Sequence, residues 1–302
     1  MSVMTPATSA SERARPCARV FCGYLCVALL ASADAAAQTA QAGAPEQTTG
    51  ISGYMDFHFN KHELEDGRLD FHRFVLLVTH SFSDRIRFVS ELELEHALVE
   101  GLEEAGELEL EQAYVDFLLS RALNVRAGML LMPVGIINER HEPPTYYGVE
   151  RPFVDTVIVP STWFDVGAGV HGELGRGWRY RAYIMSPLNA QEFTAEEGLR
   201  GGIQKGSDTN IGRPAVTGRL EYVGVPGLTV GASFWTGRSG FEFRPRFDVP
   251  VTLGETDVRY SRDRLELRGQ FAQVAISNAG LLNDAMGPGA ISRSAHWRSA
   301  SI

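Results

Sequence analysis

Cysteine and lysine are nearly absent from this 302-residue chain. The 3 cysteines (Cys17, Cys22 and Cys26) all lie near the N-terminus, so the rest of the chain has neither a disulfide framework nor a paired-cysteine metal motif. Lysine occurs only at Lys61 and Lys205, and arginine supplies the remaining positive charge. A formal net charge of −9 without a clustered basic stripe argues against nucleic acid as a partner.

Long apolar runs are also lacking. After the first 37 residues, no run reaches the roughly 18 apolar residues that a membrane-spanning helix needs. The N-terminal segment has arginines between Arg13 and Arg19, then the apolar run VFCGYLCVALLA, then small residues up to Ala37. This order is typical of a signal peptide. We predict a signal peptide over 1–37 and a polar, Ala/Gln-rich linker over 38–49.

From Gly50 onward, polar and apolar residues alternate in segments of about ten residues, the length of a tilted strand that crosses a bilayer. Very short turns (SFSD, SRA, GRG, GVPG, SRD) alternate with longer connections. Short periplasmic turns and long outer loops are the organisation of an outer-membrane barrel. We predict an all-β fold, a transmembrane antiparallel up-and-down β-barrel with about eleven strands over 50–276, followed by an irregular tail over 277–302.

The segment SELELEHALVEGLEEAGELELEQAYV has an alternative reading, because Glu and Leu are also good helix formers. The strict alternation at Leu92 and Leu94, and again at Leu108 and Leu110, favours a β-hairpin over an amphipathic helix. This alternation changes phase around Gln112, which predicts a β-bulge or a displaced strand boundary.

Charged residues recur on one face of several predicted strands, which indicates a wet interior. We expect rings of arginine to favour anions and rings of glutamate to favour cations. The lumen candidates are Arg126, Arg179, Arg181, Arg219 and Arg268 on a basic wall, and Glu91, Glu93 and Glu95 on an acidic wall.

The stretch from Met132 to Phe164 is the third long connection, and loops of such length are often functional. Its charged residues either face a pore constriction or pair with one another to hold the shape of the loop. These candidates are Glu139, Arg140, His141, Glu150 and Arg151.

The histidines are scattered, and no H-E-x-x-H spacing is present, so the sequence predicts neither a metal site nor a cofactor. Gly167, Gly169 and Gly172 match the G-x-G-x-x-G pattern, but they lie inside a strand pattern, so we interpret the match as chance. We interpret these glycines as making room for a group that approaches the barrel wall. No G-x-S-x-G elbow appears, and we predict that the protein is not an enzyme.

Between Ile51 and Ile276 the sequence resembles the phosphate-selective porin O/P family of bacterial outer membranes. The residues that carry the resemblance are Pro133-Val-Gly135, Asn138-Glu139, His141, Glu150-Arg151-Pro152, Pro160 and Trp163-Phe164. The family implies a sixteen-stranded, commonly trimeric barrel whose third outer loop folds inward to narrow the pore. This chain departs from the family in its near-absence of lysine and in its lumen glutamates.

About eleven strands do not close a single-chain barrel, which has an even strand number. We therefore interpret the chain as a truncated or frameshifted porin.

The predicted function is an outer-membrane porin, a passive diffusion channel for small hydrophilic solutes or ions, with anions such as phosphate as candidates. The expected partners are outer-membrane lipid, the solutes and, from the resemblance, further copies in a homotrimer. The alternative is a non-transporting outer-membrane barrel, either a surface or structural protein or an outer-membrane enzyme.

Overall fold

The computed structural model describes residues 47–61, 66–96, 106–148, 151–287 and 296–301. The predicted signal peptide, most of the predicted linker and Glu150 lie outside these residues. Within the described part of the chain, none of the helices is both long and apolar enough to cross a membrane.

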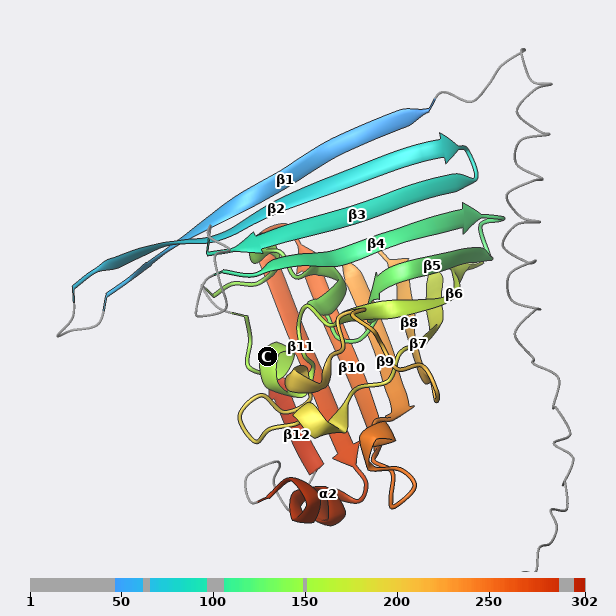
Figure 1. Ribbon diagram of the computed structural model, residues 1–302. Helices are drawn as coiled ribbons and strands as arrows, with labels where there is room; N and C mark the ends of the chain where they lie inside the picture. Colours follow the sequence, from blue (N-terminus) through green and yellow to red (C-terminus); the bar gives the residue numbers. More distant parts are fainter. Residues whose placement is uncertain (1–46, 62–65, 97–105, 149–150, 288–295, 302) are drawn as a thin grey trace, which may run out of the picture. The chain divides into compact units, whose positions relative to one another are not determined.

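A 12-stranded antiparallel sheet contains the strands of the described residues, and each strand pairs with its neighbours in the sequence (Figure 1). This order confirms the predicted all-β, up-and-down antiparallel fold class. Within the described residues the sheet is open, because β1 and β12 each pair with one strand. The strands are β1 (Thr48–Asn60), β2 (Arg68–Ser83), β3 (Ile86–Glu95), β4 (Leu108–Leu118), β5 (Asn124–Leu131), β6 (Phe164–Gly175), β7 (Trp178–Met185), β8 (Ala215–Val225), β9 (Leu228–Arg238), β10 (Pro250–Arg262), β11 (Leu265–Ile276) and β12 (His296–Ser301).

Two boundaries differ from the sequence prediction. Strand β1 begins at Thr48, inside the stretch expected to be linker. The tail expected to be irregular contains helix α2 (Ala279–Met286) and strand β12, so the sheet has one strand more than the pattern indicated. The sequence of β12, HWRSAS, has little apolar alternation, and its pairing with β11 satisfies backbone groups that an edge strand would leave unpaired.

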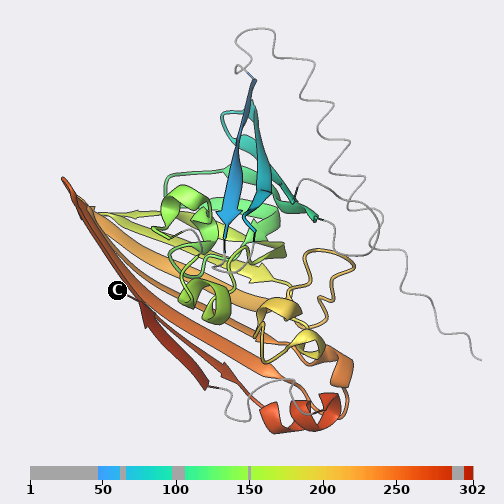
Figure 2. The ribbon, with the colours of Figure 1, turned by 90° about the vertical axis from the view of Figure 1, so that its left-hand side faces the viewer.

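The predicted alternation of short and long connections is confirmed. Turns of a few residues join β2 to β3, β4 to β5, β6 to β7, β8 to β9 and β10 to β11. Short helical turns lie in the longer connections and gather on one side of the sheet (Figure 2). They are η1 (Asn138–Arg140), η2 (Pro143–Thr145), η3 (Val154–Ile158), η4 (Ala190–Glu192), η5 (Arg200–Gly202) and η6 (Phe241–Phe243).

Strands β3 and β4 pair as the predicted hairpin and not as a helix. Their register shifts so that Glu91 pairs with Gln112 while Leu92 pairs with Leu110. Glu111 is therefore the extra residue of a β-bulge, at the place where the sequence alternation changes phase.

The two faces of the sheet differ in polarity as predicted. Ile184, Val230 and Phe234 are 59%, 43% and 46% exposed, although all three are apolar. The alternating positions Arg181 and Arg219 lie on the other face, where the long connections pack. An exposed apolar face opposite a polar face is the arrangement of a strand wall between lipid and water.

The main hydrophobic core lies between the loop that joins β5 to β6 and the face of the sheet that this loop covers. Trp163 at the end of this loop packs against Trp235 of β9 with ring centroids 5.3 Å apart, and both side chains are buried. Val154 and Ile158 of η3 belong to the same buried cluster as Leu253 of β10. Apolar burial thus holds the loop against the sheet.

Candidate functional site

The loop between β5 and β6 is closed at its base by the side chain of Asn138. Its Nδ2 donates hydrogen bonds to Met132 O at 2.8 Å and to Trp163 O at 3.0 Å. Its Oδ1 accepts a hydrogen bond from the Trp163 backbone N–H at 2.8 Å. One buried amide therefore joins the first and last residues of the loop and satisfies three backbone groups.

Polar contacts hold the loop across the sheet as far as β9 and β11. The backbone N–H of Gly135 donates to Ser233 Oγ at 3.3 Å, and Gln270 Nε2 donates to Asp155 Oδ1 at 3.2 Å. The Arg268 guanidinium donates to the backbone oxygen of Thr145. The loop therefore folds onto the polar face of the sheet. That it narrows a pore, as the family resemblance implies, stays a prediction.

A cavity of about 250 Å³ lies between this loop and the strand wall. Arginines are the most numerous residues around it, with fewer carboxylates between them. Its lining is Arg126, Gly135, Ile136, Glu139, Arg140, His171, Arg181, Arg219, Glu221, Thr229, Asp257 and Arg259. We take this charged cavity as the candidate functional site.

Buried arginines of the wall are held by carboxylates. Arg219 lies 2.8 Å from Glu221, 3.3 Å from Glu255 and 2.6 Å from Asp257. Arg181 contacts Glu221 at 3.1 Å and Glu139 of the loop at 3.1 Å. The loop is thus tied to β7 and β8 by a network in which each buried charge has a partner.

Two further arginines of the cavity form no ion pair among the described residues. They are Arg140, at the exposed end of η1, and Arg259 of β10. Their guanidinium groups therefore lack a carboxylate within ion-pair distance, and their positive charge is available to an anion in the cavity. Arg140 is one of the sequence candidates, whereas Arg259 is not.

The other basic-wall candidates lie in three different places. Arg126 forms a two-pronged hydrogen bond with Asp116 at 2.7 and 2.9 Å and borders the cavity. Arg179 is outside the cavity and pairs with Glu173 at 3.3 Å. Arg268 pairs with Glu266 and contacts the loop.

The acidic-wall candidates share the polar face of β3, but they do not line the cavity. Arg73 of β2 lies between two of them, 3.4 Å from Glu93 and 3.5 Å from Glu95. Glu91 is buried and lies 3.9 Å from His141 Nε2. These glutamates therefore serve as partners for cations of the protein itself.

His141 and Arg151 brace the loop. His141 Nε2 lies 2.8 Å from Glu111 Oε2, and its Nδ1 donates to Asn138 O at 3.1 Å. Burial by itself lowers the pKa of His141, but the contact with Glu111 and the charge of Glu91 outweigh it and raise the pKa to about 9. Arg151 donates to Ser161 Oγ and to His141 O, both at 3.3 Å.

Asp116, Glu221, Asp257 and Arg259 were missed as site residues. Alternation could have found them, because Glu221 shares a face with Arg219, and Asp257 shares one with Arg259.

The glycines that match the dinucleotide pattern lie within strand β6. A Cβ at Gly169 would collide with the backbone oxygen of Ala182 and would lie 2.6 Å from the Tyr183 ring, so the groups that approach this glycine are the backbone and a side chain of β7.

Side chains with metal-ligand chemistry come together in two groups within the described residues. One is Glu91, Glu111 and His141, in which the imidazole already pairs with Glu111. The other is Asp56, His58 and His72, on β1 and β2. The sequence spacing indicated neither group.

No protein-family model matches the sequence, so the resemblance to the phosphate-selective porin O/P family stays a prediction. Over 187 residues the chain is 42% identical to a protein of Aquifex aeolicus (strain VF5) described as an uncharacterized protein. That match covers 61% of this chain but only 43% of the relative.

Solved structures of outer-membrane proteins are similar to part of this chain. An anion-selective porin from Comamonas acidovorans matches with a TM-score of 0.49 and 13% identity, over 76% of this chain and 69% of the porin. OmpT of Vibrio cholerae, as a loop L8 deletion mutant, matches with a TM-score of 0.39 and 10% identity, over 76% of this chain and 82% of OmpT. Such scores do not fix a family, and the function has to follow from the side chains of the site.

Proposed function

We propose that the protein is a porin-type channel of the bacterial outer membrane, through which small hydrophilic solutes diffuse passively. The single observation that carries the proposal is the charged cavity, because it lies between an inward-folded loop and the polar face of an antiparallel strand wall. The opposite face is apolar and exposed, which suits contact with outer-membrane lipid. The mechanism is size exclusion at the loop combined with the field of the cavity charges.

We further propose that the channel prefers anions. Arg140 and Arg259 lie on the cavity without an ion-pair partner among the described residues, whereas its carboxylates contact arginines. An anion that enters the cavity therefore meets positive charge without having to displace a carboxylate. Phosphate fits this chemistry, because the arginine guanidinium matches phosphate oxygens in geometry and charge.

Planar-bilayer recording of the purified full chain tests the channel. We expect discrete conductance steps and a reversal potential in a KCl gradient that indicates anion preference. Protein that inserts as folded strands but gives no conductance would refute the proposal and favour the alternative of a non-transporting surface, structural or enzymatic barrel. Cation preference would refute only the proposed selectivity.

The homotrimer also remains a proposal, and it rests on the family resemblance. Chemical cross-linking of the protein in detergent, followed by mass measurement, tests it. Cross-linked species of two and three chains, with none larger, support the trimer. A mass that corresponds only to the single chain argues against it.

A further inference from the structure

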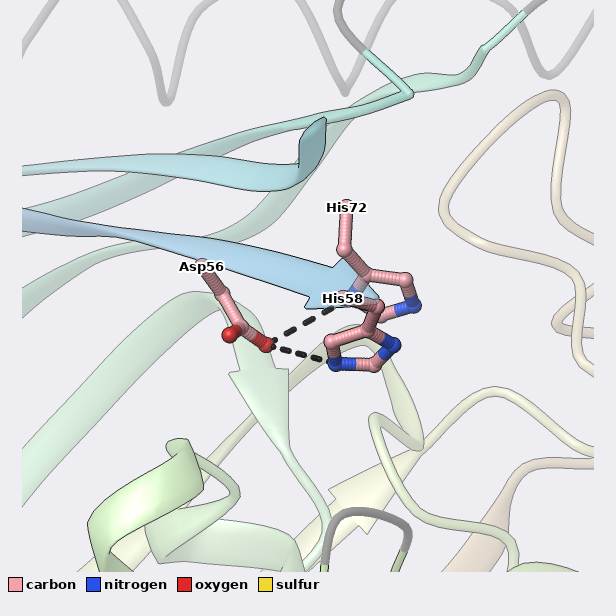
Figure 3. Close-up of side chains that lie close together, drawn as sticks. All are labelled: Asp56, His58 and His72. Atoms are coloured by element: carbon pink, nitrogen blue, oxygen red, sulfur yellow. Dashed lines mark hydrogen bonds and ion pairs between the residues drawn. The ribbon is translucent and has the colours of Figure 1, made fainter. Parts of the chain in front are cut away.

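Three strands bring together histidines that the sequence scatters. His58 of β1 and His72 of β2 stack with ring centroids 4.0 Å apart and an interplanar angle of 12°. Asp56 Oδ2 lies 3.1 Å from His58 Nε2 and 3.7 Å from His72 Nδ1, so both rings converge on one carboxylate oxygen (Figure 3). The candidate ligand atoms of these three residues all lie within 4.8 Å of one another.

A β-bulge explains why His72 reaches this group. Asp56 pairs with Arg73 and the next residue, Phe57, pairs with Phe71, so His72 is the extra residue between them. A bulge redirects the extra side chain relative to regular alternation. Here it allows a residue of β2 to join two residues of β1, where alternation already places Asp56 and His58 on one face.

The third strand helps to fix the orientation of His72. The backbone N–H of His96, which follows β3, donates to His72 O at 3.0 Å. The His96 ring lies edge-on to the His72 ring with centroids 5.6 Å apart, and its Nδ1 lies 3.0 Å from Asp70 Oδ2. The backbone of His72 is thus paired on the side of β3, and one edge of its ring is covered by His96.

The surroundings suit a bound cation with nitrogen and oxygen ligands. The group lies on the polar face, because Met55 and Phe57 alternate with it and are 59% and 53% exposed. Arg73 Nε donates to His72 Nδ1 at 3.3 Å, so this nitrogen is the unprotonated one of the ring, and a metal ion would take the place of Arg73 at its lone pair. The Arg73 guanidinium is also held by Glu93 and Glu95, so it keeps ion-pair partners when the contact with His72 is replaced.

We propose that Asp56, His58 and His72 bind one divalent transition-metal ion, with Zn²⁺ as the reference ion. Two imidazoles and a carboxylate are a ligand set that Zn²⁺ accepts, and imidazole also suits Cu²⁺ and Ni²⁺. Three protein ligands leave a fourth position open to water or to an anionic solute. The bound ion links β1 to β2 at the end of the hairpin next to their connection. The three residues do not line the charged cavity, so the proposed metal site does not depend on the proposed channel function.

Equilibrium dialysis of the full chain, purified without a polyhistidine tag, against micromolar Zn²⁺ tests the proposal. We expect one equivalent of retained Zn²⁺ per chain. His58→Gln and His72→Gln should each weaken binding by more than about 100-fold, beyond the effect of changing an outer-shell partner. His80→Gln is the matched control, because His80 lies on the same strand and contacts Thr49 instead.

A spectroscopic measurement separates loss of the site from loss of the fold. Electron paramagnetic resonance of the Cu²⁺-loaded protein should show coupling to two ring nitrogens, reduced to one in either variant, while circular dichroism of the strands stays unchanged. Failure of the unaltered chain to retain an equivalent overturns the proposal. So does loss of the retained equivalent in His141→Gln, because the ion would then belong to the group of Glu91, Glu111 and His141.

Discussion

His141 of the long loop and Glu111 of strand β4 form a buried ion pair, with Nε2 and Oε2 2.8 Å apart and both side chains 1% exposed. Glu111 reaches the loop from a β-bulge, and His141 is turned toward it by the hydrogen bond from Nδ1 to Asn138 O. A local irregularity of one strand thus anchors a loop that extends across the sheet.

Removal of one partner from this pair should release the loop. His141→Leu leaves Glu111 buried without its closest cation, and uncompensated buried charges cost about 3 to 5 kcal/mol. We expect faster proteolysis within the loop, measured as cleavage rate in the folded protein. The double variant His141→Leu, Glu111→Leu should recover much of the loss. Equal destabilisation of the single and double variants would contradict the role assigned to the pair.

The pair should also make the loop sensitive to alkaline pH. The folded pKa of His141, about 9, lies above its ordinary value, so its stabilisation is complete below about pH 6.5 and is lost as pH rises through about 9. We expect protease susceptibility of the loop and single-channel noise to increase between about pH 8 and 10. His141→Gln should remove this transition, and an unchanged transition in that variant would assign it to another group.

Asn138→Ala should open the base of the loop. The change removes two donated hydrogen bonds and one accepted hydrogen bond at a buried position. Each buried group left unpaired costs about 1 to 3 kcal/mol, so a total of about 3 kcal/mol or more is expected. Hydrogen exchange at the Trp163 amide measures the effect. Asn124→Ala is the control, because Asn124 donates a single hydrogen bond to His171 O, and an equal effect of both changes would contradict the closing role.

Arg140→Gln and Arg259→Gln should reduce anion preference. A unit charge at close range in water contributes about 1 kcal/mol, so each change should lower the anion-to-cation permeability ratio by about fivefold. The reversal potential in a salt gradient measures this ratio. Arg179→Gln is the matched control, since Arg179 pairs with Glu173 outside the cavity. An unchanged reversal potential in the two cavity variants, or an equal shift in the control, would contradict the assignment.

Strand pattern and turn length were sufficient to predict most of the fold. Alternation placed Ile184 and Phe234 on one face and Arg219 on the other, and the phase change at Gln112 marked the bulge of β4. These features are local, because the period of two and the turn length are written in adjacent residues. Strand β12 escaped prediction because its pairing with β11, and not an apolar pattern, defines it.

The candidate site could be predicted only in part. Arg126, Arg181 and Arg219 were expected on the polar face, and all three line the cavity. Arg140 also lines it; the sequence left open whether the loop charges face a constriction or pair within the loop. The sequence could not separate Arg140, which faces the cavity, from His141, which anchors the loop. Adjacent residues of a short helical turn point in different directions, and their partners come from distant strands.

The sequence by itself determined that the chain forms consecutive antiparallel strands with one polar and one apolar face, since side-chain alternation and short turns act between neighbours in the chain. The tertiary structure alone decided which charged side chains have an ion-pair partner and which do not, because ion pairs such as Arg219 with Asp257 join residues on different strands. It likewise gathered Asp56, His58 and His72 around one point, through a bulge that the spacing of the histidines does not reveal.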